Sequence, residues 1–103
     1  MRVDLIPSLT NEQIIHCSQN DTQLRKWTFE LVSNDALIEP QGSFSLVYPT
    51  GEIPLTVDGD SLLCDCTADL SARSGMFPCK IKITNGDEVL YSSIITLHCE
   101  VRP

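Results

Sequence analysis

The sequence has no hydrophobic run that approaches the roughly 20 residues of a membrane-spanning helix. Its first residues, Met1 to Pro7, also lack the long apolar stretch of a secretory signal peptide. We therefore expect a soluble chain without a transmembrane segment and without a visible export signal.

Positive charge is scarce. The chain has 7 Lys and Arg against 14 Asp and Glu, which gives a formal net charge of −7. A phosphate backbone or an anionic membrane surface would repel such a protein. We expect neither nucleic acid nor a membrane as a partner.

Motifs of catalysis are missing as well. The sequence has no nucleophile elbow, no catalytic cysteine context and no recognisable acid/base pair of carboxylates. His16 precedes Cys17, but adjacency in sequence does not supply the geometry of a base beside a nucleophile. We expect no catalytic residue, no cofactor and a protein that is not an enzyme.

The clearest structural pattern present is a β-hairpin near the C-terminus. Cys79, Ile81 and Ile83 alternate with polar residues, and after Asn-Gly at 85–86 the apolar residues continue with the same period of two to Val101. Asn-Gly between alternating runs predicts a tight turn, since both of its positions favour positive φ. On this pattern Val89 and Tyr91 share the inward face of the later apolar residues.

Short strands of the same kind recur through the rest of the chain. Alternation or apolar runs predict strands at 12–17, 25–33, 44–48 and 61–66, and Pro54 makes 52–57 an edge or irregular strand. With the hairpin this gives about seven strands, spaced by turn signals every 8 to 12 residues or so, as in an antiparallel sandwich. Thr67 and Gly75 can cap one short helical turn near 68–74. The prediction is an all-β, antiparallel, immunoglobulin-like β-sandwich over residues 12–103, preceded by an N-terminal arm over 1–11.

Five cysteines are many for a chain without a signal peptide. Three of them, Cys64, Cys79 and Cys99, fall in step with apolar neighbours, and Cys66 continues the phase of Cys64. Free cysteine is among the most buried residue types, so core filling is the favoured interpretation. One disulfide stays open as an alternative, between Cys17 and Cys79.

Two His-Cys pairs, at 16–17 and 98–99, raise the question of zinc. Structural zinc sites place cysteine pairs on turns so that both thiolates reach one centre. Here the pairs lie within predicted strands, where neighbouring side chains face opposite ways. We therefore expect no metal site, and we read Asp58-Gly59-Asp60 as a solvated turn.

Cys17, Trp27 and Cys79 also resemble the cysteine and tryptophan landmarks of an immunoglobulin domain. Phe77 stands where that fold has its corner tyrosine, Trp27 comes early after Cys17, and three further cysteines have no counterpart. The pattern supports an immunoglobulin-like sandwich, and an immunoglobulin-like cell-surface binding domain remains the alternative function.

A second resemblance covers more of the chain. Its segments are 14–31, with a Gln-x-Asp turn, an arginine and an alternating strand; 49–51, a Pro-x-Gly turn; and 66–83, a Thr-containing corner that ends in glycine before a Cys-bearing strand. Over about residues 12–101 the sequence resembles the N-terminal domain of phage baseplate upper proteins. Asn20, where an aromatic is common in that family, and the extra cysteines are departures.

The resemblance implies a non-catalytic structural module of a phage or prophage tail baseplate. Such a virion component would be assembled in the bacterial host cytoplasm, would dock on other tail proteins and could form a homotrimer. Gln19, Asp21 and Arg25 match the family pattern and are candidate interface residues. The competing interpretation is local, because Asp21 can cap its own turn and pair with Arg25.

Overall fold

The computed structural model describes residues 2–4, 13–33, 36–37 and 42–101 of the chain. These residues form strands, turns and bends, and no helix occurs among them; in particular, none is long and apolar enough to cross a bilayer. The strands are β1 (Arg2–Asp4), β2 (Gln13–Ser18), β3 (Lys26–Ser33), β4 (Ala36–Leu37), β5 (Ser43–Tyr48), β6 (Gly51–Pro54), β7 (Thr56–Asp58), β8 (Ser61–Asp65), β9 (Gly75–Asn85), β10 (Glu88–Tyr91) and β11 (Ile95–Glu100).

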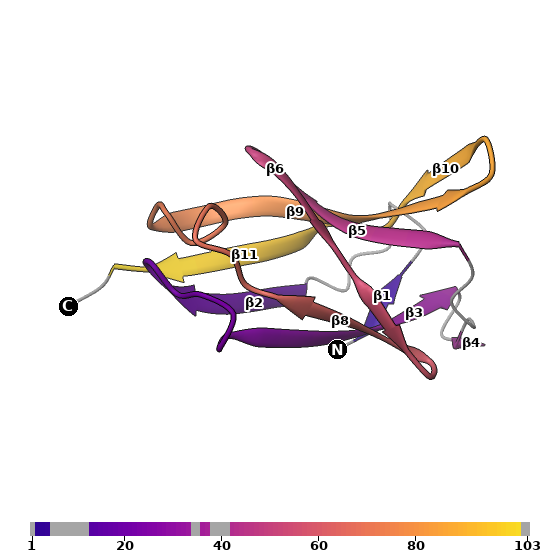
Figure 1. Ribbon diagram of the computed structural model, residues 1–103, viewed down its shortest axis with the longest axis horizontal. Coiled ribbons are helices and arrows are strands. Elements are labelled where there is room, and N and C mark those ends of the chain that lie inside the picture. Colours follow the sequence, from indigo (N-terminus) through magenta and orange to yellow (C-terminus); the bar gives the residue numbers. More distant parts are fainter. Residues whose placement is uncertain (1, 5–12, 34–35, 38–41, 102–103) are drawn as a thin grey trace.

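The strands form two sheets, which lie one above the other in Figure 1. The first sheet has the order β1-β3-β8-β7, with β4 also paired to β3. The second has the order β2-β11-β9-β5-β6, with β10 also paired to β9. Phe29 and Leu62 from the first sheet and Leu46 and Leu97 from the second belong to one buried cluster. The expected all-β architecture is confirmed, with two sheets around a common core.

The alternation in β3 orients that strand as predicted. Phe29 and Leu31 are buried, and Trp27 packs against the core from a partly buried position. β3 lies between β1 and β8, so it is an interior strand of its sheet. The period of two identifies both the strand and its buried face, because a shift of one residue in register would move every side chain to the opposite face of the sheet.

Two strand pairs correct the expectation of a purely antiparallel arrangement. β1 runs parallel to β3, and β2 runs parallel to β11. Both involve the N-terminal part of the chain, which reaches its partners through long connections, whereas only antiparallel neighbours can be joined by tight turns. Residues 2–4 of the expected arm thus form β1, in which Val3 is buried, and the rest of that arm lies outside the described residues.

The corner at 67–75 contains turns where a short helical turn was expected. Thr67 caps it as predicted, since its hydroxyl accepts the N–H of Leu70 at 3.2 Å. The N–H of Ser71 reaches the carbonyl of Thr67 at 3.2 Å, but no further bond of this kind follows in the described corner, and the helical turn is not confirmed. Gly75 has a positive φ of 129° and opens β9, so it does not end a helix there.

The predicted hairpin forms, with its turn moved by one residue. Asn85 and Glu88 are the closing pair, so the two turn residues are Gly86 and Asp87. Gly86 has φ 63°, and Asp87 is not among the residues with positive φ. A glycine at the first turn position with positive φ there alone is the pattern of a type II′ turn. The turn therefore needs glycine at one position, where the sequence pattern predicted two residues with positive φ.

A bulge separates β10 from β11 along the same edge of β9. Tyr91 pairs with Lys82 and Ile95 pairs with Cys79, so three residues, 92–94, face two residues of β9. The extra residue reverses the alternation at this point. Val89 and Tyr91 consequently do not share the inward face of Ile95, and the predicted continuous phase is wrong here.

One stretch of chain passes from the second sheet to the first. β6 pairs with β5, β7 pairs with β8, and only Leu55 stands between them. The N–H of Leu55 donates to the carbonyl of Phe44 at 2.9 Å. β6 and β7 both end their sheets, which confirms that the segment around Pro54 is an edge.

Candidate functional site

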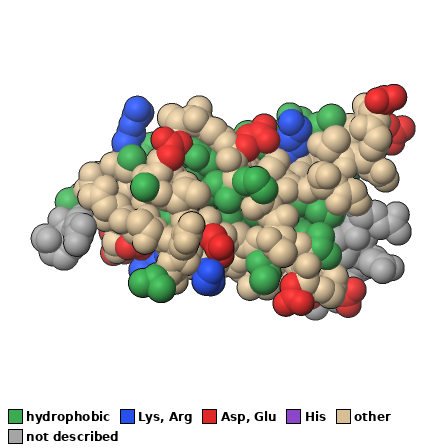
Figure 2. Space-filling view, in the orientation of Figure 1, with side chains coloured by type: hydrophobic (Ala, Val, Ile, Leu, Met, Phe, Trp, Pro, Cys, Tyr) green, Lys and Arg blue, Asp and Glu red, His purple; other side chains and the backbone are tan. Residues whose placement is uncertain are grey.

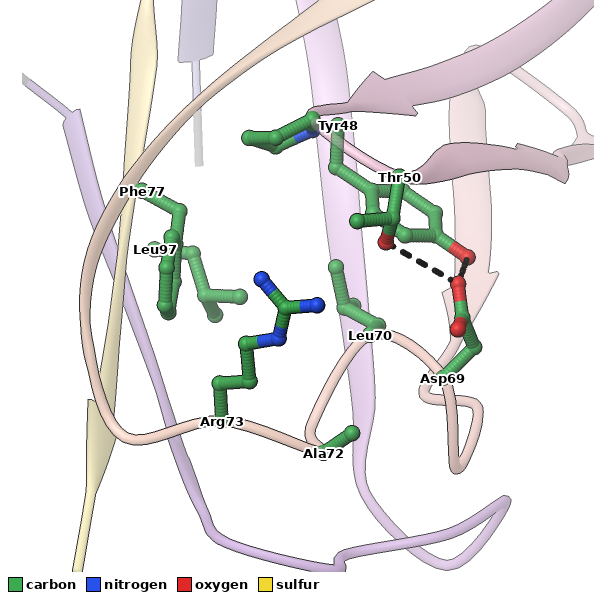
Figure 3. Close-up of a pocket in the computed structure, with 9 residues that line it drawn as sticks. Tyr48, Thr50, Asp69, Leu70, Ala72, Arg73, Phe77 and Leu97 are labelled. Atoms are coloured by element: carbon green, nitrogen blue, oxygen red, sulfur yellow. Dashed lines mark hydrogen bonds between the residues drawn. The ribbon is translucent and has the colours of Figure 1, made fainter.

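A small pocket lies where the 67–75 corner meets the turn between β5 and β6 (Figure 3). Its volume is about 110 Å³. Sites for drug-sized ligands and cofactors occupy roughly 300–1,000 Å³, so this pocket has room for one side chain of a partner rather than for a nucleotide or a cofactor. It is lined by Tyr48, Pro49, Thr50, Asp69, Leu70, Ala72, Arg73, Phe77 and Leu97.

Asp69 links the residues of one wall of the pocket by hydrogen bonds. Its carboxylate accepts hydrogen bonds from the hydroxyl of Tyr48 at 2.7 Å and from that of Thr50 at 3.1 Å (Figure 3). Burial, and then the bond to Asp69, raise the pKa of Tyr48, so its phenol stays a proton donor. The bonds hold the β5–β6 turn against the corner and leave Asp69 engaged on this wall.

Arg73 supplies the positive charge of the pocket. Figure 3 shows its guanidinium inside the pocket, between the side chains of Phe77 and Leu97 on one side and Leu70 on the other. Within the described part of the chain it makes no hydrogen bond and no ion pair. A guanidinium next to apolar walls suits a carboxylate carried on a partner's side chain.

The three predicted interface residues lie beside this corner and are used within the chain. The carboxylate of Asp21 accepts the N–H of Ser18 at 2.8 Å and the Nε–H of Arg25 at 2.9 Å. The amide of Gln19 donates to the carbonyl of Ala72 at 3.2 Å. The local interpretation of Asp21 and Arg25 thus describes their contacts, while a role in an interface stays a prediction.

Further hydrogen bonds join the turn that contains Asn20 and Asp21 to the 67–75 corner. The N–H of Asn20 donates to the carbonyl of Ser71 at 2.9 Å, and the buried hydroxyl of Ser71 donates to the carbonyl of Asp21. Asn20 has φ 69°, the only positive value at a non-glycine residue in the described chain. Asparagine tolerates this conformation better than an aromatic residue does, which gives a local reason for Asn20.

Leu24 is a surface feature that the sequence reasoning missed. Its side chain is 96% exposed at the turn before β3, where the N–H of Arg25 donates to the carbonyl of Thr22 at 2.9 Å. The clue was a leucine in an otherwise polar turn between two strands. A leucine presented on a hydrogen-bonded turn is a contact that a partner could cover.

The disulfide weighed between Cys17 and Cys79 is not formed, and all five cysteines are free. Cys17 pairs with Cys99 on β11, and Cys79 pairs with Ile95 on the opposite edge of that strand. The Cα atoms of the two cysteines are therefore separated by two strand spacings, about 9.6 Å, and by four residues along β11, about 13 Å. A disulfide needs Cα atoms within about 7 Å.

The five thiols fill the core, and the strand phase predicted this for Cys64, Cys66, Cys79 and Cys99. Each cysteine is at most 3% exposed. Burial raises the pKa of Cys64 to about 12 and that of Cys79 to about 11, and it also raises the pKa of Cys66 and, together with the neighbouring Cys99, that of Cys17. A protonated, buried thiol is a poor nucleophile and a poor metal ligand.

The two histidines point away from the core, unlike their neighbouring cysteines, and lie close to each other. Cys17 and Cys99 face the core, so His16 and His98 face outward, as alternation requires. The parallel pairing of β2 with β11 sets the two imidazoles opposite each other, with ring centroids 5.4 Å apart. Alternation places each histidine and its neighbouring cysteine on opposite faces, as expected, but no local pattern indicates this cross-strand pair.

The β9–β10 hairpin beyond the bulge, residues 82–91, forms an arm. All four residues of β10 are exposed, although Val89, Leu90 and Tyr91 are apolar or aromatic. In Figure 1 this hairpin projects at the upper right, and Figure 2 shows acidic side chains at its tip. The arm lies at the opposite end of β9 from the Arg73 pocket.

Neither the comparison with protein-family models nor the comparison with curated proteins gives a match for this chain. The surfaces of the chain are therefore what points to its function.

Proposed function

We propose that this chain is a non-catalytic adaptor in the baseplate of a phage or prophage tail, and that it docks on other tail proteins through the β9–β10 arm. The observation that carries the docking role is the exposure of apolar side chains on both faces of β10. The tail assignment rests on the sequence resemblance over residues 12–101, and with it come a virion location, assembly in the host cytoplasm and a homotrimer.

Both faces of the arm offer contact area. Leu90 pairs with Ile83, whose side chain packs against the core, so Leu90 points to the core side of the sheet, where its side chain stays exposed. Val89 and Tyr91 point to the other side, and each of the three β10 side chains is between 43% and 51% exposed. Consecutive apolar residues exposed on two faces are typical of a surface that a partner covers.

The edge of the arm adds a directional element. β10 hydrogen-bonds only to β9 among the described strands, so its outer edge presents backbone N–H and C=O groups. Natural proteins protect such an edge or use it to receive a strand from a partner. The acidic tip at Asp87 and Glu88 would disfavour pairing of two arms with each other at this point, which favours a different protein as the partner.

The state of the thiols supports the non-catalytic part of the proposal. Cysteine thiols are the strongest nucleophiles in the sequence, but each of them is buried. Burial raises the pKa of Cys17, Cys64, Cys66 and Cys79. The Arg73 pocket has room for a single side chain, which suits recognition of an acidic residue. Both features fit a binding protein.

An immunoglobulin-like cell-surface binding domain is the second candidate, and strand order favours it. If β1, β3, β5, β7, β8, β9 and β11 are lettered A to G, the first sheet reads A-B-E-D and the second contains G-F-C. This is the order of immunoglobulin sandwiches. Against it, Trp27 lies on the second of these strands rather than the third, and Cys17 and Cys79 share one sheet.

Capture of the tail hub proteins encoded near this gene tests the leading proposal. The chain is co-expressed with each of them and the complexes are isolated by size-exclusion chromatography, using the wild type, Leu90→Asp and the control Val57→Asp. Leu90 and Val57 are 48% and 46% exposed, but Val57 lies on β7. We expect the wild type and Val57→Asp to co-elute with a tail hub protein and Leu90→Asp to elute alone.

Thermal unfolding of each variant, and a second arm variant, Val89→Asp, separate loss of contact from loss of fold. A chain that binds none of these hub proteins, or that loses binding only through Val57→Asp, would contradict the proposed arm. A gene without phage tail neighbours would count against the baseplate itself.

A further inference from the structure

The outward face of β2 and β11 carries three metal-binding side chains in one place. His16 and His98 are directly opposite each other in the parallel register, and Glu100 follows His98 by two residues on the same face. One nitrogen or oxygen donor from each of the three lies within 4.8 Å of the donors of the other two. The cluster is independent of the β9–β10 arm and of the Arg73 pocket.

The geometry needs only small rotations to close on an ion. The two rings are tilted by 60° with their centroids 5.4 Å apart, so they are not stacked face to face. Zn²⁺ binds histidine nitrogen at about 2.0–2.1 Å and carboxylate oxygen at about 2.0–2.2 Å, which places the donors of one tetrahedron about 3.3 Å from one another. His16 and Glu100 are exposed and His98 is partly buried, so rotation about their side-chain bonds can bring the donors together.

The donor types select the kind of ion. Two imidazoles and one carboxylate suit Zn²⁺ and similar transition metals, whereas Mg²⁺ and Ca²⁺ prefer oxygen ligands throughout. With the chain at a net charge of −7, its surroundings favour a cation. No charged side chain occupies the outward positions that flank the cluster in the described strands, which are Ile14, Ser18, Thr96 and Met76.

We propose that His16, His98 and Glu100 form a zinc-binding site on the outer face of the second sheet. The site supplies three ligands, and water completes the tetrahedron. It lies on the surface at the pair of strands β2 and β11, so the bound ion joins the two strands through side chains as well as backbone bonds. This inference stands apart from the proposed baseplate role.

Titration of the chain of residues 1–103 with ZnCl₂, monitored by isothermal calorimetry, tests the site. The protein must carry no polyhistidine tag and must be kept reduced. We expect one Zn²⁺ per chain, with affinity lowered about tenfold or more by His16→Gln or His98→Gln and to a smaller degree by Glu100→Gln. Asp87→Asn, which removes one exposed carboxylate at the hairpin tip, is the matched control and should bind as the wild type does.

Two further measurements keep the result specific. Co²⁺ substitution should give a visible spectrum without an intense sulfur-to-metal charge-transfer band, because the thiols remain buried in the core. Circular dichroism of each variant must match that of the wild type. Absence of zinc binding at millimolar metal, unchanged affinity in a correctly folded His98→Gln, equal affinity for Ca²⁺, or a thiolate band would each overturn the proposal and leave the histidines as a solvated cross-strand pair.

Discussion

The hydroxyl of Ser92 accepts the backbone N–H of Ile81 at 2.9 Å, and the N–H of Ser92 donates to the carbonyl of the same residue at 2.9 Å. A single serine thus supplies both hydrogen bonds that a regular strand residue would make there, one of them with its side chain. Ser92 is wholly buried. This exchange allows the bulge between β10 and β11 to lie inside the protein with the neighbouring backbone satisfied.

Ser92→Ala should therefore destabilise the protein by about 1–3 kcal/mol, because the buried N–H of Ile81 loses its acceptor. Equilibrium denaturation in urea measures the change. Ser43→Ala is the control, since Ser43 is exposed on β5 and its side chain makes no bond in the described structure. Equal stabilities for the two variants would show that water replaces the serine hydroxyl.

Gly42→Ala should cost more stability than Gly86→Ala. Both glycines have positive φ, 100° and 63°, so each substitution carries a backbone cost of about 1–2 kcal/mol. A Cβ at Gly42 would also overlap the backbone carbonyl of Thr84, whereas a Cβ at Gly86 meets open space. Thermal unfolding of the two variants measures the difference, and a larger loss for Gly86→Ala would contradict the packing described between β5 and β9.

Asp21→Ala should lower the free energy of unfolding by about 1 kcal/mol through loss of its bond to the N–H of Ser18. Asp58→Ala is the control, because the Asp58 side chain is exposed and makes no hydrogen bond or ion pair in the described chain. Urea denaturation distinguishes the two interpretations of Asp21. If stability is unchanged while binding to a tail protein is lost, Asp21 is an interface residue rather than a turn cap.

Stability should fall as the pH rises above about 9. The ordinary pKa of a cysteine thiol is 9.0, and burial raises that of Cys79 to about 11 and that of Cys64 to about 12. Below pH 9 these thiols are protonated in both the folded and unfolded states; above it the unfolded state releases protons that the folded state retains. Each such thiol then lowers the free energy of unfolding by up to about 1.4 kcal/mol per pH unit, until the pH reaches its folded pKa.

Denaturation curves between pH 8 and 11 check this dependence. A thiol reagent at pH 8 provides a second measurement, with five cysteines reacting after unfolding and few reacting quickly before it. Substitution of Cys64 by alanine should flatten the decline in stability with pH, although the cavity also lowers stability at every pH. A pH-independent stability, or rapid native-state reaction of several thiols, would contradict the buried, protonated state.

Period-two alternation predicted most of the strands because it depends on burial of one face, which each strand carries in its own residues. Phe29 and Leu31 in β3 and the buried cysteines at 64, 79 and 99 all follow that rule. Pro54 likewise placed its segment at an edge. These are local signals, and tertiary structure did not override them.

The features that were missed depend on contacts between distant segments. Nothing near His16 indicates that β2 will pair in parallel with β11, so the cross-strand pair with His98 was invisible. The bulge at Ser92 lies in a stretch whose apolar residues keep a period of two without a break, so the pattern did not reveal it. The Arg73 pocket arises where the corner meets the β5–β6 turn, and no motif marks it.

The parallel register of β2 and β11 has a consequence for how the protein would carry force. Both strands point the same way, so tension that draws the Gln13 end of β2 away from the Glu100 end of β11 acts along the strands. Their evenly spaced hydrogen bonds are then loaded together in shear, whereas a hairpin pulled from its open end would break its bonds one after another. Single-molecule extension through attachment points beside these two strands would therefore meet its resistance at this pair.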